Sequence, residues 1–287
     1  MSIAQCGITA RPFAVALMFL YTLSAYTQPL SGRVLDRATR KPIPFATVYL
    51  EQTAIGTYAD SAGTFNLSVG HHPNRPLTVS ALGYTTEKIQ PEPGRPVTVY
   101  LTEAAVRLNE VVVRKPRETL FEFGSKRRLS IRTFKSCVSW KLILAHRINK
   151  PVKGAVVYLA EVSFLAKNES DKPGQLRVIL YTPDHTGNFP DSVLSHQVVT
   201  VPPATSRLQG SRRMTVPLNS VPIRTDAFFV GIEWIVTSTG LDCKRSSVVT
   251  EPSDPDDFVV WMDHSNRWRS FVTLASKPIV RFKAFTD

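Results

Sequence analysis

The sequence predicts an all-β protein built from two β-sandwiches, and three observations lead to this prediction. Short runs rich in Val, Thr, Phe and Tyr alternate between apolar and polar residues, which is typical of strands with one buried face. The 14 glycines and 21 prolines lie between these runs, where turns are expected. With 287 residues, 43% of them hydrophobic, the chain is long enough for about two domains with real cores.

The first stretch, residues 1–27, is expected to be a secretory signal peptide. An apolar run at residues 13–23 follows a single arginine and precedes small residues. This run is shorter than the ~20 residues of a comfortable membrane span. Ala25 and Thr27 suit the positions before cleavage at Gln28. The alternative is an uncleaved anchor.

The first sandwich is expected at residues 28–113. The stretch FNLSV places Phe65, Leu67 and Val69 on one face and polar residues on the other. The stretches ATVYL, LTVSALGY and VTVYL show the same alternation, and the loops between the runs contain prolines, which cannot donate to a ladder. The pattern therefore indicates half-buried antiparallel strands.

Several motifs in this region together resemble the carboxypeptidase regulatory-like domain: Gly32-x-Val34-x-Asp36, Pro42-x-Pro44-Phe45-Ala46, Thr57-x-x-Asp60-x-x-Gly63-x-Phe65 and Val79-Ser80-x-Leu82-Gly83-Tyr84. The resemblance implies a small transthyretin-like, Ig-like sandwich. The same module resembles the N-terminal extension of TonB-dependent outer-membrane receptors, which implies a Gram-negative envelope. The chain is not itself expected to be a receptor, because the residues after Val113 lack the many ten-residue amphipathic strands of a receptor barrel.

Five residues of these motifs are expected to be structural. Asp60 can accept hydrogen bonds from backbone amides and Gly63 tolerates a positive φ, so the pair suits a tight turn. Phe65 then re-enters the core. Gly83, which precedes Tyr84, suits a bulge or a close backbone approach. None of these residue types performs chemistry in this pattern, so the motifs describe a scaffold.

The rest of the chain divides into a basic linker at residues 114–136 and a second, jelly-roll-like β-sandwich at residues 137–287. In AVVYLAEVSFLA one phase is expected to face the core: Val156, Tyr158, Ala160, Val162, Phe164 and Ala166. In FFVGIEWIV, Trp234 shares the apolar phase and Glu233 lies on the other face. This half resembles, less specifically, an uncharacterised sandwich that follows the regulatory-like module in envelope proteins.

The formal charge of +12 limits the classes of partner. Basic clusters bind nucleic acid, anionic lipid or acidic glycan, and export excludes nucleic acid. The favoured interpretation is a solvated linker and a solubilising face. Trp268, flanked by two arginines, and the pair Arg212 and Arg213 are the weak candidates for a ligand-binding surface.

The sequence indicates no catalytic residue, metal site or cofactor. No His-x-x-Glu pair is present, so the zinc site of a metallocarboxypeptidase is not expected. No Gly-x-Ser-x-Gly or phosphate loop occurs. Asp184, Asn188 and Asp191 resemble a calcium loop only loosely, and a polar turn is favoured. Cys137 and Cys243 could form a disulfide after export.

These observations favour a non-catalytic envelope accessory module that binds a protein partner or a glycan. The expected location is the periplasm or the cell surface, with association at the outer membrane. Two alternatives stay open: a hydrolase of envelope polymer with its site in the second sandwich, and a structural envelope component.

Overall fold

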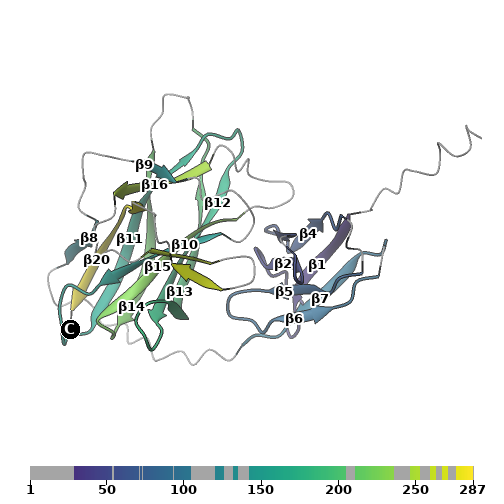
Figure 1. Cartoon of the computed structure of the whole chain (residues 1–287), viewed down its shortest axis with the longest axis horizontal. Coiled ribbons are helices and arrows are strands. Elements are labelled where there is room, and N and C mark those ends of the chain that lie inside the picture. The colour runs from purple at the N-terminus through teal and green to yellow at the C-terminus, as the bar shows by residue number, and fades with distance from the viewer. Residues whose placement is uncertain are drawn as a thin grey trace, which may run out of the picture.

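The computed structural model describes residues 29–53, 55–70, 72, 74–92, 94–104, 120–125, 132–134, 142–204, 211–235, 246–252, 259–262, 267–270 and 276–286. These residues form two β-sandwiches, a smaller one near the N-terminus and a larger one after it (Figure 1). The predicted all-β fold class is therefore confirmed. Within these ranges there is no helix long and apolar enough to cross a membrane.

In the described residues, the smaller sandwich contains seven strands: β1 (Leu30–Asp36), β2 (Thr47–Leu50), β3 (Gly56–Tyr58), β4 (Thr64–Leu67), β5 (Leu77–Ser80), β6 (Glu87–Ile89) and β7 (Val97–Leu101). One sheet has the order β4-β1-β7 and the other has the order β3-β2-β5-β6. Strand β1 is antiparallel to β4 and parallel to β7. The inward residues of both sheets form one core that includes Val34, Phe65, Leu77 and Val99. The predicted burial of Phe65, Leu67 and Val69 is confirmed.

Gly32, the glycine that begins the first motif, allows close packing between β1, β7 and the Phe65 ring. Gly32 pairs with Phe65 on one side and with Val97 on the other. A Cβ atom at Gly32 would lie 2.2 Å from the Val97 carbonyl oxygen and 2.6 Å from the Phe65 ring. The position therefore requires glycine because strand and ring approach its backbone closely.

The larger sandwich contains the remaining strands: β8 (Phe121–Gly124), β9 (Arg132–Phe134), β10 (Ile143–Asn149), β11 (Val157–Asn168), β12 (Gly174–Pro183), β13 (Pro190–Val201), β14 (Arg212–Ile223), β15 (Ala227–Ile235), β16 (Ser246–Pro252), β17 (Val259–Met262), β18 (Trp268–Ser270), β19 (Ser276–Pro278) and β20 (Val280–Thr286). One sheet has the order β13-β12-β15-β10-β17-β18. The other sheet contains the neighbours β14, β11, β20 and β8, extended by β16, β9 and β19.

The pairing of these strands is nested in the way that defines a jelly roll. Strand β12 pairs with β13, β11 with β14, β10 with β15, and β8 with β20, each pair antiparallel. Successive pairs alternate between the two sheets, as when a long hairpin folds over on itself. The predicted jelly-roll-like topology is therefore confirmed.

The linker prediction needs a correction, because the first strand of the jelly roll lies inside residues 114–136. Strand β8 pairs with β20, and Phe123 stacks on Phe282 with ring centroids 5.3 Å apart. The stretch FEFG is a short edge strand, so it offers too few alternating residues for a strand signal from sequence. The second sandwich thus begins before residue 137.

The predicted phase of β11 is correct only in its second half. Val162, Phe164 and Ala166 are buried as expected, but in the first half the buried residues are Val157 and Leu159. The register shifts between Leu159 and Glu161 against both neighbouring strands, which marks a β-bulge. One extra residue reverses the inward phase, and strict alternation cannot anticipate this reversal.

Candidate functional site

The two outer faces of the jelly roll have different surroundings. The first domain lies against the six-stranded sheet, on the side of β15 that points away from the core. Leu82 of the first domain packs against a cluster that includes Tyr181 and Phe229. Phe45 and Tyr58 pack with Ile235 at a second contact. This face is therefore a domain interface.

A buried polar contact lies within this interface. The Tyr58 hydroxyl donates a hydrogen bond to Glu233, and the Arg177 guanidinium forms an ion pair with the same carboxylate at 3.1 Å. A second nitrogen of Arg177 donates to the Phe45 carbonyl oxygen at 2.6 Å. Glu233 is only 1% exposed. The sequence placed Glu233 correctly on the outer face of its strand, but a neighbouring domain covers that face.

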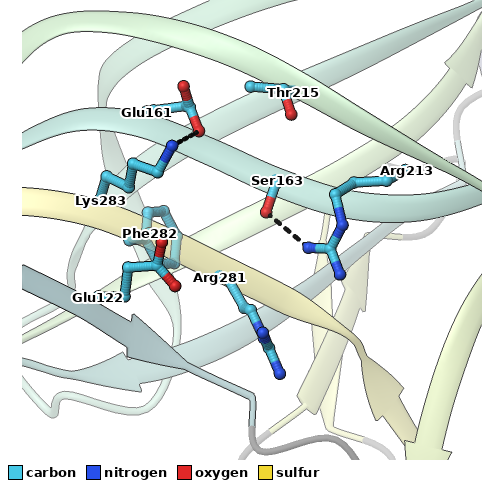
Figure 2. Close-up of a pocket in the computed structure, with 8 residues that line it drawn as sticks. All are labelled: Glu122, Glu161, Ser163, Arg213, Thr215, Arg281, Phe282 and Lys283. Carbon is cyan, nitrogen blue, oxygen red and sulfur yellow. Dashed lines mark hydrogen bonds and ion pairs between the residues drawn. The ribbon is translucent and has the colours of Figure 1, made fainter.

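The opposite sheet carries a pocket of about 280 Å³ on its outer face. We call it the outer-sheet pocket, and Figure 2 shows its lining: Glu122, Glu161, Ser163, Arg213, Thr215, Arg281, Phe282 and Lys283. These residues come from β8, β11, β14 and β20, the four adjacent strands of one half of the jelly roll. The rigid sheet therefore positions every lining side chain.

The register of the strands explains why the surface is hollow there. Ser163 lies between Arg281 on β20 and Thr215 on β14 in one cross-strand row. Ser and Thr are short, while the longer side chains of Arg213, Lys283 and Glu161 rise from neighbouring rows. Side chains opposite one another on adjacent strands lie ~5 Å apart, so the long ones form walls around the short ones.

The pocket is strongly polar, and only some of its charged side chains form ion pairs with described residues. Lys283 forms an ion pair with Glu161 at 3.2 Å. Arg213 donates a hydrogen bond to the Ser163 hydroxyl at 3.2 Å, and Arg281 donates to the Ser125 carbonyl oxygen at 3.3 Å. Within the part of the chain that the structure describes, neither of these guanidinium groups forms an ion pair.

Figure 2 shows the Arg213 guanidinium turned toward the Ser163 hydroxyl, and Arg281 on the neighbouring strand with its guanidinium directed away from Ser163. Glu122, Glu161 and Lys283 lie at the other end. The lining thus combines two guanidinium groups that can bind an anion with carboxylates and hydroxyls that can bind hydroxyl groups. Such a set suits recognition of a polar ligand by hydrogen bonds.

The structure separates the two arginines that the sequence grouped. Arg213 faces the outer-sheet pocket, whereas Arg212 lines a different, smaller hollow with Asn168 and Pro202. Consecutive residues of a strand point to opposite faces, which explains the separation. The sequence-based candidate pair is therefore two residues with different surroundings.

Trp268 is not near either arginine. It lies on β18 of the six-stranded sheet and makes an edge-to-face contact with Tyr181, with ring centroids 5.5 Å apart. The same cluster includes Leu82 of the first domain. Trp268 is thus part of the surroundings of the domain interface, while Trp234 is in the main core at 1% exposure, as its phase predicted.

The turn residues of the first domain have the geometry expected of a scaffold. The backbone amides of Ala62 and Thr64 donate to the Asp60 carboxylate at 2.9 and 2.8 Å. Gly63 has φ +71°, and a Cβ there would lie 2.7 Å from the Val34 carbonyl oxygen. Phe65 is 1% exposed. These contacts form the predicted turn and return the chain to the core.

Gly83 is needed for a different reason from the one that the sequence suggested. Its φ is +84°, but no atom lies within 4 Å of a Cβ placed there, so the position requires a left-handed backbone and not a close approach. Hydrogen bonds from the backbone amide and the hydroxyl of Thr39 hold the pKa of Asp36 below its usual value.

The loop at Asp184, which loosely resembles a calcium loop, forms a polar turn in the structure. The Asp184 carboxylate accepts hydrogen bonds from Thr186 and from the amides of Asn188 and Phe189, which is a closed polar turn. Among the described residues, no group of three His, Cys, Asp or Glu side chains could hold a metal ion. Cys137 and Cys243 lie outside the described residues, so their pairing stays a prediction.

Most of the outer-sheet pocket could not be predicted from the sequence. Its residues come from segments more than 150 positions apart, such as Glu122 and Arg281, and only β-pairing unites them. One local signal was available: in VRFKAF, Arg281 and Lys283 alternate with buried Phe282, which indicates a basic outer face.

A comparison with protein families finds a model described as CarboxypepD_reg-like domain that matches residues 30–113. Those residues are a CarboxypepD_reg-like domain. The resemblance predicted from the motifs is therefore confirmed, and the match coincides with the smaller sandwich. This regulatory-like family is non-catalytic and suggests a binding, Ig-like module. The comparison with curated proteins gives no match.

Some solved structures are distantly similar to most of the chain. The clostridial cysteine protease Cwp84, in its form after propeptide cleavage, is similar at 10% identity and a TM-score of 0.41, over 81% of this chain and 52% of that one. The VP2 subviral particle of infectious bursal disease virus is similar at 11% identity and a TM-score of 0.25, over 84% and 63%. The chain thus spans about half the length of the Cwp84 structure. At these values, neither likeness supports an argument about activity.

Proposed function

We propose that this protein is an exported, non-catalytic binding module of a Gram-negative envelope, and that it binds a glycan in the outer-sheet pocket. The observation that carries the proposal is the pocket itself. It is concave, it lies on a sheet, and its lining offers charged and hydroxyl groups. Ligand sites are typically concave surfaces with a few convergent polar groups.

The arrangement of the two domains supports this assignment. The CarboxypepD_reg-like domain lies against one sheet of the jelly roll, while the pocket is on the other sheet. The first domain and the pocket are thus on opposite sides of the jelly roll. This arrangement suits an accessory module whose ligand-binding surface faces away from its other domain. The signal-like residues 1–27 support export.

A glycan suits this pocket better than a protein partner does. Protein interfaces usually centre on apolar and aromatic anchors. Among the described residues that line the outer-sheet pocket, Phe282 is the one aromatic, and its side chain is fully buried beneath the sheet. The accessible groups are hydrogen-bond donors and acceptors, which match the hydroxyl groups of a sugar.

The proposal can be tested by sedimentation of the purified protein with insoluble or vesicle-bound envelope polymers: peptidoglycan, lipopolysaccharide and capsular polysaccharide. We expect at least one polymer to retain the protein with no increase in reducing ends. Retention by none of the polymers would overturn the glycan assignment. Release of reducing ends that depends on the protein would overturn the non-catalytic assignment and support the hydrolase alternative.

A further inference from the structure

We propose that the outer-sheet pocket recognises a sugar that carries a carboxylate, and that Arg213 and Arg281 together bind that carboxylate. This inference rests on the proposed glycan-binding function and names the class of sugar. The ligand is a uronic acid residue, such as galacturonate, within an envelope polysaccharide.

The charges of the pocket favour an anionic group at its arginines. The lining contains three cationic side chains and two carboxylates, and the one ion pair among them joins Lys283 to Glu161. Arg213 and Arg281 line the side of the pocket away from Glu161 and Lys283, as Figure 2 shows. Two guanidinium groups that line one pocket without a neutralising carboxylate from the described residues attract an anion. A guanidinium group suits a planar carboxylate, because two parallel N–H···O hydrogen bonds can join the two groups.

Hydrogen bonds hold both guanidinium groups in place. Arg213 donates to the Ser163 hydroxyl at 3.2 Å, and Arg281 donates through its Nε atom to the Ser125 carbonyl oxygen at 3.3 Å. Because this bond of Arg281 uses Nε, its two terminal nitrogens can still donate to a ligand. A guanidinium held in this way loses less side-chain freedom when it binds an anion.

The carboxylates of the pocket distinguish a uronate from other anions. Glu122 and Glu161 line the opposite end of the pocket. Glu161 is paired with Lys283, while Glu122, which forms no ion pair with a described residue, would repel a purely anionic ligand such as a phosphate cluster or a poly-acidic peptide. A uronate carries one carboxylate and several hydroxyl groups on the same ring. Its carboxylate can face the arginines while its hydroxyls donate to the glutamates.

The size of the pocket agrees with this ligand. Its volume of about 280 Å³ is near the lower limit of the ~300–1,000 Å³ that is usual for ligand sites. A single sugar ring suits such a volume. The pocket therefore fits one residue of a polymer.

The experiment measures binding of three probes to the full chain by isothermal titration calorimetry: trigalacturonate, the neutral trisaccharide maltotriose, and a triglutamate peptide. We expect trigalacturonate to bind, with an affinity that falls as salt increases, and the other two probes to bind at least tenfold more weakly. Loss of one charge-assisted hydrogen-bonding partner reduces affinity by about 10- to 100-fold, so Arg213→Gln and Arg281→Gln should each weaken binding by this factor.

The matched control is Arg212→Gln, because it removes the same charge from the adjacent residue but lines the separate hollow. It should bind trigalacturonate as the unmodified protein does. Arg281→Lys should restore only part of the affinity, because an ammonium group cannot bind a carboxylate in the bidentate manner. Circular dichroism spectra of all variants should overlay, which excludes unfolding as the cause of lost binding.

Any other binding result would contradict either the uronate inference, the glycan-binding function or the location of the site. Equal binding of maltotriose would overturn the uronate inference and leave the glycan-binding function in place. Equal or tighter binding of triglutamate would overturn both in favour of an acidic peptide. If no probe binds but an envelope polymer still retains the protein, the uronate inference fails while the proposed function stands. If Arg212→Gln weakens trigalacturonate binding as much as Arg213→Gln does, the ligand does not bind in the outer-sheet pocket.

Discussion

The buried ion pair at the domain interface gives the sharpest prediction about stability. Arg177→Ala would leave Glu233, which is only 1% exposed, without its cationic partner. Removal of one member of a buried pair costs about 3–5 kcal/mol, because the remaining charge stays desolvated and uncompensated. We therefore expect the free energy of unfolding of the jelly roll to fall by about this amount.

A matched control comes from the surface of the first domain. Arg95 and Glu92 form an ion pair at 2.7 Å, but their side chains are 77% and 69% exposed. Exposed pairs contribute about 0–1 kcal/mol, so Arg95→Ala should have little effect on unfolding. The double variant Arg177→Ala/Glu233→Ala should cost less than the sum of the two single variants, because no unpaired charge remains.

The assay is urea unfolding followed by tryptophan fluorescence. All four tryptophans, Trp140, Trp234, Trp261 and Trp268, follow the CarboxypepD_reg-like domain in the chain, so this signal reports the second domain. Circular dichroism, which reports both domains, would detect separate transitions. A loss for Arg177→Ala no larger than that for Arg95→Ala would show that the domain interface does not bury this pair in solution, and would refute the reasoning.

Three further predictions concern backbone geometry and titration. Gly32→Ala should destabilise the first domain by about 1–3 kcal/mol in urea unfolding followed by circular dichroism, because its Cβ would lie 2.2 Å from the Val97 carbonyl oxygen. Gly124→Ala should destabilise the jelly roll by a similar ~1–3 kcal/mol and weaken ligand binding, because φ is +115° and its Cβ would lie 2.4 Å from the Val280 carbonyl oxygen. The lowered pKa of Asp36 stabilises the fold at pH above the unfolded value of 3.8, and this stability is lost as the pH falls through the folded pKa. Asp36→Asn should therefore reduce the dependence of urea stability on pH below about 4.

Each of these predictions has a result that contradicts it. Unchanged stability of Gly32→Ala would mean that β1 and β7 separate enough to admit a methyl group. Unchanged binding by Gly124→Ala would show that β8 does not shape the pocket. An equally steep acid limb in Asp36→Asn would mean that other carboxylates, and not Asp36, control acid unfolding of the first domain.

The sequence was most informative where structure depends on local pattern. Alternation identified the strands that contain Phe65 and Trp234, and the turn at Asp60 and Gly63 followed from the hydrogen-bonding capacity of Asp and the backbone freedom of Gly. The motifs also identified the domain that residues 30–113 form. Each of these features is encoded within a few consecutive residues, so a single sequence suffices to predict it.

Apolar–polar alternation gave a wrong prediction where a single inserted residue or a pairing with a distant strand decides the local structure. The bulge between Leu159 and Glu161 reverses the inward phase of β11, and alternation alone cannot locate it. Strand β8 is too short to be recognised among basic residues, yet its partner β20 makes it part of the sheet. In both cases, pairing with distant strands decides the structure.

The sequence by itself determined that the chain forms β-sandwiches with a regulatory-like domain first, because core-facing residues recur along each strand. Only the tertiary structure decided which surfaces matter. Glu233 lies on the outside of its strand, and contact with Tyr58 and Arg177 makes it a buried interface residue. Arg213 joins Arg281 in a pocket and separates from its neighbour Arg212, because cross-strand register brings distant residues together while adjacent residues point apart.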